Sequence, residues 1–162
     1  MWKFASSVIA AGIVMSQALF AADLAAQKPA GTAPAALNFK VQSLEGKEVD
    51  LAQYQGKVVL VVNVASKCGL TPQYKKLESL YQKYNVTFPL MAKVEVNGAG
   101  TCDFYKHLKA LDVKPKGPGE ISWNFEKFLI GRNGQVVARF QPRTAPDDAA
   151  VIAVIEGELG KK

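Results

Sequence analysis

The chain has few of the residues that build metal centres. Its 162 residues include two cysteines, Cys68 and Cys102, and one histidine, His107. Two thiols and one imidazole at these spacings do not form a zinc-ligand pattern, so no metal site is expected. We interpret His107 as a packing residue of a short helix near residues 103–111. A single structural disulfide between the two cysteines stays open as one interpretation.

Long runs of one kind of residue are also missing. The formal net charge is +6, but the lysines are spread in pairs such as Lys75-Lys76. No basic run interleaves with aromatic residues, so nucleic acid is not expected as a partner. No apolar stretch reaches the roughly 20 residues that a membrane-spanning helix needs. The length and the 49% hydrophobic content suit one globular domain and are too small for two.

The beginning of the chain differs in composition from the rest. Residues 1–21 carry one lysine, Lys3, near their beginning, continue with an apolar run and end in small residues. This is the pattern of a secretory signal peptide. An uncleaved membrane anchor is the alternative, although the apolar run is short for one. We therefore expect export to a periplasm or the cell exterior, with no membrane span after cleavage. Residues 22–36 are rich in alanine and proline and predict a flexible linker, which leaves residues 37–162 as the domain.

The domain shows alternating strand and helix patterns. Residues 37–51 predict a hairpin around Glu45-Gly46, and the apolar run 57–64 predicts a central strand covered on both faces. A helix follows, with Thr71 as its cap and Pro72 in its first turn. The remaining pattern predicts a strand over 87–96, a helix near 103–111, a hairpin around Asn133-Gly134 and a helix over about 147–159. This order indicates an α/β domain with a central mixed β-sheet flanked by helices.

Cys68 stands between the end of a buried strand and the start of a helix, which is where open α/β sheets form sites. The free N–H groups at the helix start and the neighbouring Lys67 favour the thiolate. Gly69 leaves room for a substrate beside the sulfur. Disulfide-exchange sites usually carry a second cysteine three residues on, where this chain has Thr71. A single attacking thiol suggests peroxide reduction through a sulfenic acid, and a buried, inert cysteine is the alternative.

Three segments resemble glutathione peroxidases. Residues 44–74, "LEGKEVDLAQYQGKVVLVVNVASKCGLTPQY", resemble the amino-terminal half of that family, in which the position of Cys68 carries the peroxidatic residue. Residues 86–98, "VTFPLMAKVEVNG", and residues 121–146, "ISWNFEKFLIGRNGQVVARFQPRTAP", resemble later blocks. The similarity covers about residues 37–160.

The resemblance implies a thioredoxin-like fold and the reduction of hydrogen peroxide or organic hydroperoxides in oxidative-stress defence. It identifies Trp123 and Asn124 as the family's catalytic tryptophan and asparagine, whose N–H groups can donate hydrogen bonds to a thiolate. No cofactor is implied beyond an external thiol reductant, either glutathione or a thioredoxin-like protein. Cys102 is the only internal candidate for a resolving cysteine.

One departure from the family pattern follows the first helix. A strand and crossover helix of roughly thirty residues, which carry the family's catalytic glutamine, are absent between residues 84 and 85. We expect their loss to expose an edge of the strand 57–64. A catalytically impaired thioredoxin-like scaffold that acts by binding is therefore the alternative to an active peroxidase.

Overall fold

The computed structural model describes residues 35–86 and 90–161. The predicted signal peptide and residues 22–34 of the predicted linker lie outside this part of the chain. The described part begins with a 3₁₀ turn, η1 (Ala35–Leu37), in which Ala36 and Leu37 are buried. The linker was therefore predicted to end two residues too late, because Ala36 packs into the core.

The predicted amino-terminal hairpin is confirmed. Strand β1 (Lys40–Gln42) pairs antiparallel with β2 (Glu48–Asp50). A second 3₁₀ turn, η2 (Leu51–Tyr54), follows at once, and the side chain of Asp50 caps it by accepting a hydrogen bond from the N–H of Ala52. The buried side chains of Val49 and Leu51 hold this hairpin against the domain.

A three-stranded antiparallel sheet forms the centre of the domain. Its order is β3 (Val59–Val62), β4 (Lys127–Ile130) and β5 (Val136–Phe140). All four residues of β4 are buried. The turn between β4 and β5 contains Gly134 at a φ of 73°, a conformation that glycine adopts without steric cost. The hairpin predicted around Asn133-Gly134 is thus confirmed.

Strand β3 is at the edge of this sheet and not at its centre. Among the described residues it pairs with β4 alone, and its four residues are only half-buried. The single parallel pairing in the described chain is an isolated bridge between Pro115 and Arg139. Of the parallel pairing expected in a mixed sheet, only this bridge is present there. The physical reason is the absent strand and crossover helix, since such a unit places a parallel strand beside its starting strand.

The strand predicted over residues 87–96 is wrong for its described part, residues 90–96. This segment makes one isolated bridge, between Met91 and Ser43, and the carbonyl of Leu90 accepts a hydrogen bond from the N–H of Leu44 at 2.8 Å. Leu90 is 62% exposed. An apolar pattern forms a strand only where a neighbouring strand can pair with it, and here only the end of the short β1–β2 hairpin is within reach.

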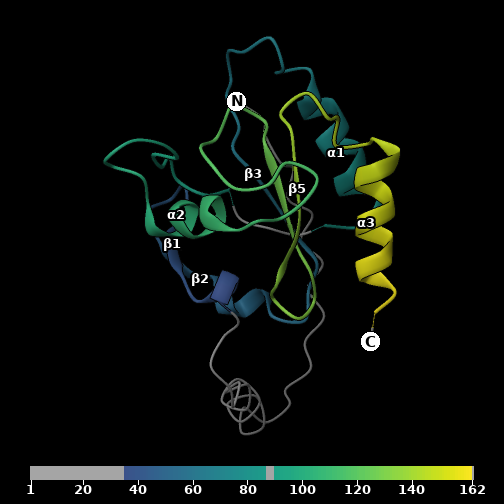
Figure 1. Ribbon diagram of the computed structural model, residues 1–162, viewed down its shortest axis with the longest axis horizontal. Coiled ribbons are helices and arrows are strands. Elements are labelled where there is room, and N and C mark those ends of the chain that lie inside the picture. Colours follow the sequence, from purple (N-terminus) through teal and green to yellow (C-terminus); the bar gives the residue numbers. More distant parts are fainter. Residues whose placement is uncertain (1–34, 87–89, 162) are drawn as a thin grey trace, which may run out of the picture. The chain divides into compact units, whose positions relative to one another are not determined.

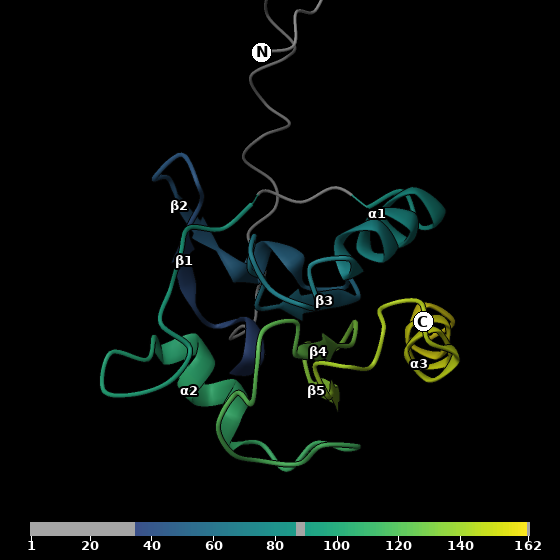
Figure 2. The same cartoon turned by 90° about the horizontal axis from the view of Figure 1, so that it is seen from above.

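In the part of the chain that the structure describes, three helices cover the two faces of the sheet: α1 (Gln73–Lys83), α2 (Asp103–Ala110) and α3 (Ala149–Leu159). Figures 1 and 2 show α2 on one side of the sheet and α1 with α3 on the other. Two core clusters match this arrangement. Phe128 and Ile130 of β4 pack with Phe104 and Leu108 of α2, whereas Leu129 packs with residues of α1 and α3. The alternation of side chains along β4 therefore supplies both cores.

The helices near 103–111 and 147–159 agree with the sequence patterns to within two residues at each end. Asp148 caps α3 by accepting a hydrogen bond from the N–H of Ala150. His107 is half-buried on α2, with its ring 5.4 Å from that of Phe39, so it packs as expected. None of the helices in the described part has the length and hydropathy to cross a membrane.

Candidate active site

Cys68 lies in a tight turn between β3 and α1. Its carbonyl accepts a hydrogen bond from the N–H of Thr71 at 3.0 Å, and its own N–H donates to Thr71 Oγ1 at 2.9 Å. The same hydroxyl donates to the carbonyl of Ala65 at 3.4 Å. Thr71 was predicted as the helix cap, and this is wrong: Pro72 precedes the first helical residue, and no side chain caps α1. The hydroxyl of Thr71 instead fixes the turn that presents the thiol.

Groups from two parts of the chain act as hydrogen-bond donors to the Cys68 sulfur. The N–H of Leu70 lies 3.4 Å from Sγ, and the indole Nε1 of Trp123 lies 3.3 Å from it. The side chain of Asn124 adds the smallest hydrogen-bonding contribution to the lowered pKa of this thiol. Together they lower the pKa of the thiol below its ordinary value; the bond from Leu70 contributes most, partial burial opposes the change, and Trp123 and Asn124 add to it. The structure therefore brings Cys68, Trp123 and Asn124 together.

The two residues that flank Cys68 lie at the surface. A Cβ atom built at Gly69 would have no heavy atom within 4 Å, so the space beside the thiol is open to a small substrate. Lys67 is exposed, and its support of the thiolate stays a prediction. The side chain of Trp123 is 62% exposed, so the donor face of the site borders on solvent.

The turn that carries Trp123 is held by Asn63, the residue directly after β3. Its side-chain amide donates to the carbonyl of Trp123 at 3.1 Å, and its Oδ1 accepts from the N–H of Glu126 at 3.0 Å. Its backbone carbonyl accepts from the N–H of Phe125 at 2.6 Å. Asn63 was not singled out from the sequence. The signal that could have found it is a polar residue at the end of an apolar strand, next to the cysteine turn.

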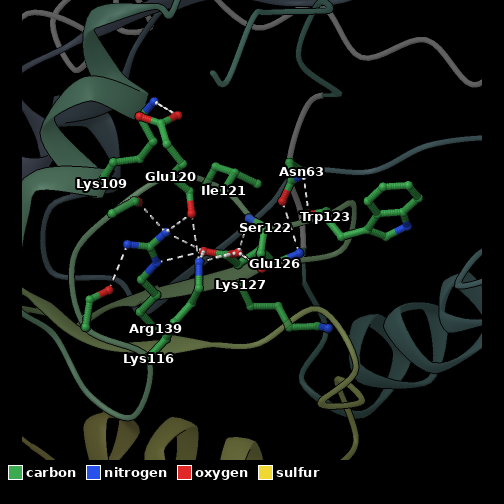
Figure 3. A network of polar contacts seen from close by, with 12 residues as sticks. Asn63, Lys109, Lys116, Glu120, Ile121, Ser122, Trp123, Glu126, Lys127 and Arg139 are labelled. Atoms are coloured by element: carbon green, nitrogen blue, oxygen red, sulfur yellow. Dashed lines mark hydrogen bonds and ion pairs between the residues drawn. The ribbon is translucent and has the colours of Figure 1, made fainter. Parts of the chain in front are cut away.

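Glu126 holds the same turn from the other side (Figure 3). Its fully buried carboxylate accepts hydrogen bonds from Arg139 Nε at 2.7 Å and from Lys116 Nζ at 2.8 Å to each oxygen. The backbone N–H and the hydroxyl of Ser122 both donate to Oε2 at 3.0 Å. Ser122 directly precedes Trp123, so this ion-pair network anchors the loop that delivers the indole and the amide to the sulfur.

Cys102 and Gln73 are not part of this arrangement. Both cysteines are free thiols, and Cys102 precedes α2 on the face of the sheet opposite to α1. The resolving role of Cys102 stays a prediction. Gln73 is buried, with its amide donating to the carbonyl of Pro142 at 2.8 Å and accepting from Lys127, so it does not stand in for the absent glutamine. No cluster of three or more metal-ligating side chains occurs within residues 35–86 and 90–161.

Comparisons with known proteins agree with this geometry. A sequence model of the family described as glutathione peroxidase matches residues 36–85. The glutathione peroxidase-like peroxiredoxin 2 of Saccharomyces cerevisiae is 40% identical over 136 aligned positions, covering 63% of this chain and 84% of that protein. The thioredoxin/glutathione peroxidase of Escherichia coli is 32% identical, and the alignment covers 75% of this chain and 95% of that protein. The crystal structure of Trgpx in its apo form superposes on this chain with a TM-score of 0.69 at 42% sequence identity. The match covers 78% of this chain and 96% of that one.

The alignment with the yeast relative also shows the shortening of this chain. It has 136 positions, but 63% of 162 residues is about 102 residues, so about 34 positions of the relative have no counterpart here. That number agrees with the length of one strand and crossover helix, roughly thirty residues. The identity extends over most of the relative's length, and the solved structure shares the thioredoxin-like fold of the described domain. The chain therefore belongs to the glutathione peroxidase family of thiol-dependent peroxidases.

Proposed function

We propose that the protein reduces hydrogen peroxide or organic hydroperoxides with Cys68 as the attacking thiol. The observation that carries this proposal is the convergence of the Leu70 N–H and the Trp123 indole N–H on one sulfur, with Asn124 adding to the lowered pKa of the thiol. Hydrogen bonds to the charged form of a thiol favour the thiolate, which is the nucleophile. No chemistry beyond that of the side chains and a thiol reductant is needed.

In the first step the Cys68 thiolate attacks one oxygen of the peroxide. A sulfur–oxygen bond forms, the oxygen–oxygen bond breaks, and the second oxygen leaves as water or an alcohol after it takes up a proton. The sulfur is oxidised by two electrons to a sulfenic acid, and the peroxide is reduced by two. The indole N–H of Trp123 and the amide of Asn124 stabilise the negative charge that develops on the departing oxygen.

In the second step an external thiol restores the enzyme. Its sulfur attacks the sulfenic sulfur, a disulfide to Cys68 forms, and water leaves. A second thiol then attacks this mixed disulfide and releases the Cys68 thiolate, so two thiols are oxidised for each peroxide reduced. The name of the Escherichia coli relative includes both thioredoxin and glutathione. For this chain we propose a thioredoxin-like dithiol or glutathione as the reductant, since Cys102 directly precedes α2, and α2 and α1 cover opposite sides of the sheet (Figure 1).

We further propose that this reaction takes place outside the cytoplasm, in a periplasm or the cell exterior. The signal-peptide pattern of residues 1–21 supports this location. A test is to fractionate cells that express the full chain and to compare the mass of the protein in each fraction. A shorter protein in the exported fraction supports the proposal, and a full-length protein retained inside the cell contradicts it.

Trapping the sulfenic acid tests the proposed reaction directly. The reduced protein is mixed with one equivalent of hydrogen peroxide in the presence of dimedone, and the modified residue is located by mass spectrometry. We expect the adduct on Cys68, with little on Cys102. A Cys102→Ser variant is the control, because it should form the same adduct. An unmodified Cys68 after this treatment favours the alternative, a catalytically impaired scaffold without the glutamine segment.

A further inference from the structure

A buried ammonium group lies close to the active site and takes no part in the reaction described above. Lys127, the first residue of β4, is fully buried. Its Nζ donates to four oxygens: Gln73 Oε1 and the carbonyl of Phe125, both at 2.6 Å, the carbonyl of Pro142 at 3.1 Å and that of Thr144 at 2.5 Å. Three are backbone carbonyls and the fourth is an amide, so none of these partners is a carboxylate. Burying a cation without a contacting anion is costly, and such a group calls for an explanation.

The four oxygens belong to three separate parts of the active-site region. Gln73 is the first residue of α1, the helix that follows the Cys68 turn. Phe125 comes directly after Trp123 and Asn124. Pro142 and Thr144 lie in the loop between β5 and α3, which Gln73 also contacts through its bond to the Pro142 carbonyl. One ammonium group thus joins the segment that carries the thiol to the segment that carries its two side-chain donors.

The backbone of Phe125 shows why such a tie is needed. Its φ is +68°, a left-handed conformation that is sterically unfavourable for a bulky residue. The surroundings hold it there: its N–H donates to the Asn63 carbonyl, its carbonyl accepts from Lys127, and its ring packs edge-on against Tyr74 with centroids 5.3 Å apart. This turn directs the Trp123 and Asn124 side chains back towards the sulfur.

Lys127 and Glu126 are neighbours in sequence, but Figure 3 shows the side chain of Lys127 pointing away from the Glu126 network. The two residues therefore hold the Trp123 turn from different sides. Burial lowers the pKa of Lys127 to about 8, with Glu126 as the nearby charge that opposes the change. At neutral pH the ammonium is mostly protonated, and its three N–H donors are shared among the four oxygens.

From these contacts we propose that Lys127 is a positioning residue for the peroxidatic thiol: it fixes the distance between the Cys68 turn and the Trp123–Asn124 donors. The inference rests on the proposed function for its biological meaning. Its test does not, because the reactivity of Cys68 toward an alkylating reagent reports the state of the thiol even in a protein that turns over no peroxide.

The test is the pH profile of Cys68 alkylation by iodoacetamide, measured on the full-length protein in a Cys102→Ser background. Lys127→Met keeps the length of the side chain and removes its donors. We expect alkylation near pH 6 to slow about threefold or more, with the midpoint of the profile moving to higher pH, because the donors to the thiolate are displaced. The peroxide reaction should slow in parallel.

Lys109→Met is the matched control. Lys109 is also a buried lysine, but its Nζ contacts Glu120 at 2.8 Å, Thr101 and Asn97, and none of these touches the Cys68 turn. We expect this variant to lose stability and to keep the parental alkylation profile. A folded Lys127→Met protein with an unchanged profile overturns the proposal. An equal change in both variants also overturns it, because the effect is then one of general stability.

A second variant decides the matter if Lys127→Met does not fold. Gln73→Met removes only the amide that Lys127 and the Pro142 carbonyl share. We expect the same direction of change with a smaller size, about twofold in the alkylation rate near pH 6. A folded Gln73→Met protein with the parental profile contradicts a tie between α1 and the donor turn through Lys127.

Discussion

Replacement of Glu126 by glutamine is expected to destabilise the domain strongly. The carboxylate is completely buried, and so is the guanidinium of Arg139, while Lys116 is 11% exposed. Glu126→Gln keeps the shape of the side chain and removes its charge. Two cations are then left in the interior without their counter-ion, and one of the new amide hydrogens faces a donor group.

The size of the effect follows from this burial. Breaking a buried ion pair from one side costs about 3–5 kcal/mol, because an uncompensated charge remains. The carbonyls of Gly117 and Gly119 accept hydrogen bonds from Arg139 at 2.8 and 2.7 Å, so that guanidinium keeps some partners and we expect a value at the lower end of the range. Domains of this size have about 5–15 kcal/mol of stability in total, so the variant should fold but unfold at a much lower urea concentration.

Urea denaturation at pH 7, followed by far-UV circular dichroism, measures this loss. Glu48→Gln is the control: Glu48 and Lys40 form an ion pair at 2.7 Å, but both side chains are more than 60% exposed. An exposed pair contributes about 0–1 kcal/mol, so this variant should be close to the parent protein. A Glu126→Gln variant that loses less than about 1 kcal/mol refutes the view that the buried charge of Glu126 stabilises the network behind the Trp123 turn.

The pH dependence of this difference provides an independent check. Burial acts to raise the pKa of Glu126, but the hydrogen bonds from Lys116, Ser122 and Arg139 outweigh it and lower the pKa below its ordinary value of 4.5. A lowered pKa in the folded state contributes stability above the unfolded value, and this contribution is lost as the pH falls through the folded value. The stability gap between the parent and Glu126→Gln should therefore be constant near neutral pH and shrink below pH 4.5.

Three further outcomes are expected. Trp123→Phe removes one donor to Cys68 Sγ and should slow peroxide consumption about tenfold, measured with hydrogen peroxide at neutral pH; an unchanged rate contradicts the role of the indole. Leu129→Ala should cost about 2–5 kcal/mol in urea denaturation, because Leu129 is fully buried in the core between the sheet, α1 and α3. Asp148→Ala should cost about 1 kcal/mol by the same assay through the loss of the α3 cap, and Asp147→Ala, which leaves the cap intact, should cost less.

Local patterns predicted the elements that local interactions determine. The β4–β5 hairpin is specified by apolar runs around Asn133-Gly134, and α3 by an acidic cap with an apolar side. The position of β3 in the sheet and the irregular course of residues 90–96 depend on which strands are present elsewhere in the chain. Apolar runs carry no information about such partners, so both predictions failed.

The residues of the site divide in the same way. Cys68 was identified from its place between a strand and a helix, and Trp123 and Asn124 from the resemblance to a family motif. The residues that hold them, Glu126 and Lys127, are charged, and a charged pair in a sequence ordinarily indicates a solvated position. Only the folded chain shows that Arg139, Lys116 and a set of backbone oxygens surround them.

The second-order rate constant for hydrogen peroxide consumption by the reduced protein tests the central claim most directly. A Cys68→Ser variant and a Cys102→Ser variant are measured beside the parent. We expect a rate far above that of a free thiol, abolished in Cys68→Ser and retained in the first turnover of Cys102→Ser. A parental rate no higher than that of an ordinary thiol would contradict it, and would mean that the donors around Cys68 do not suffice without the absent glutamine segment.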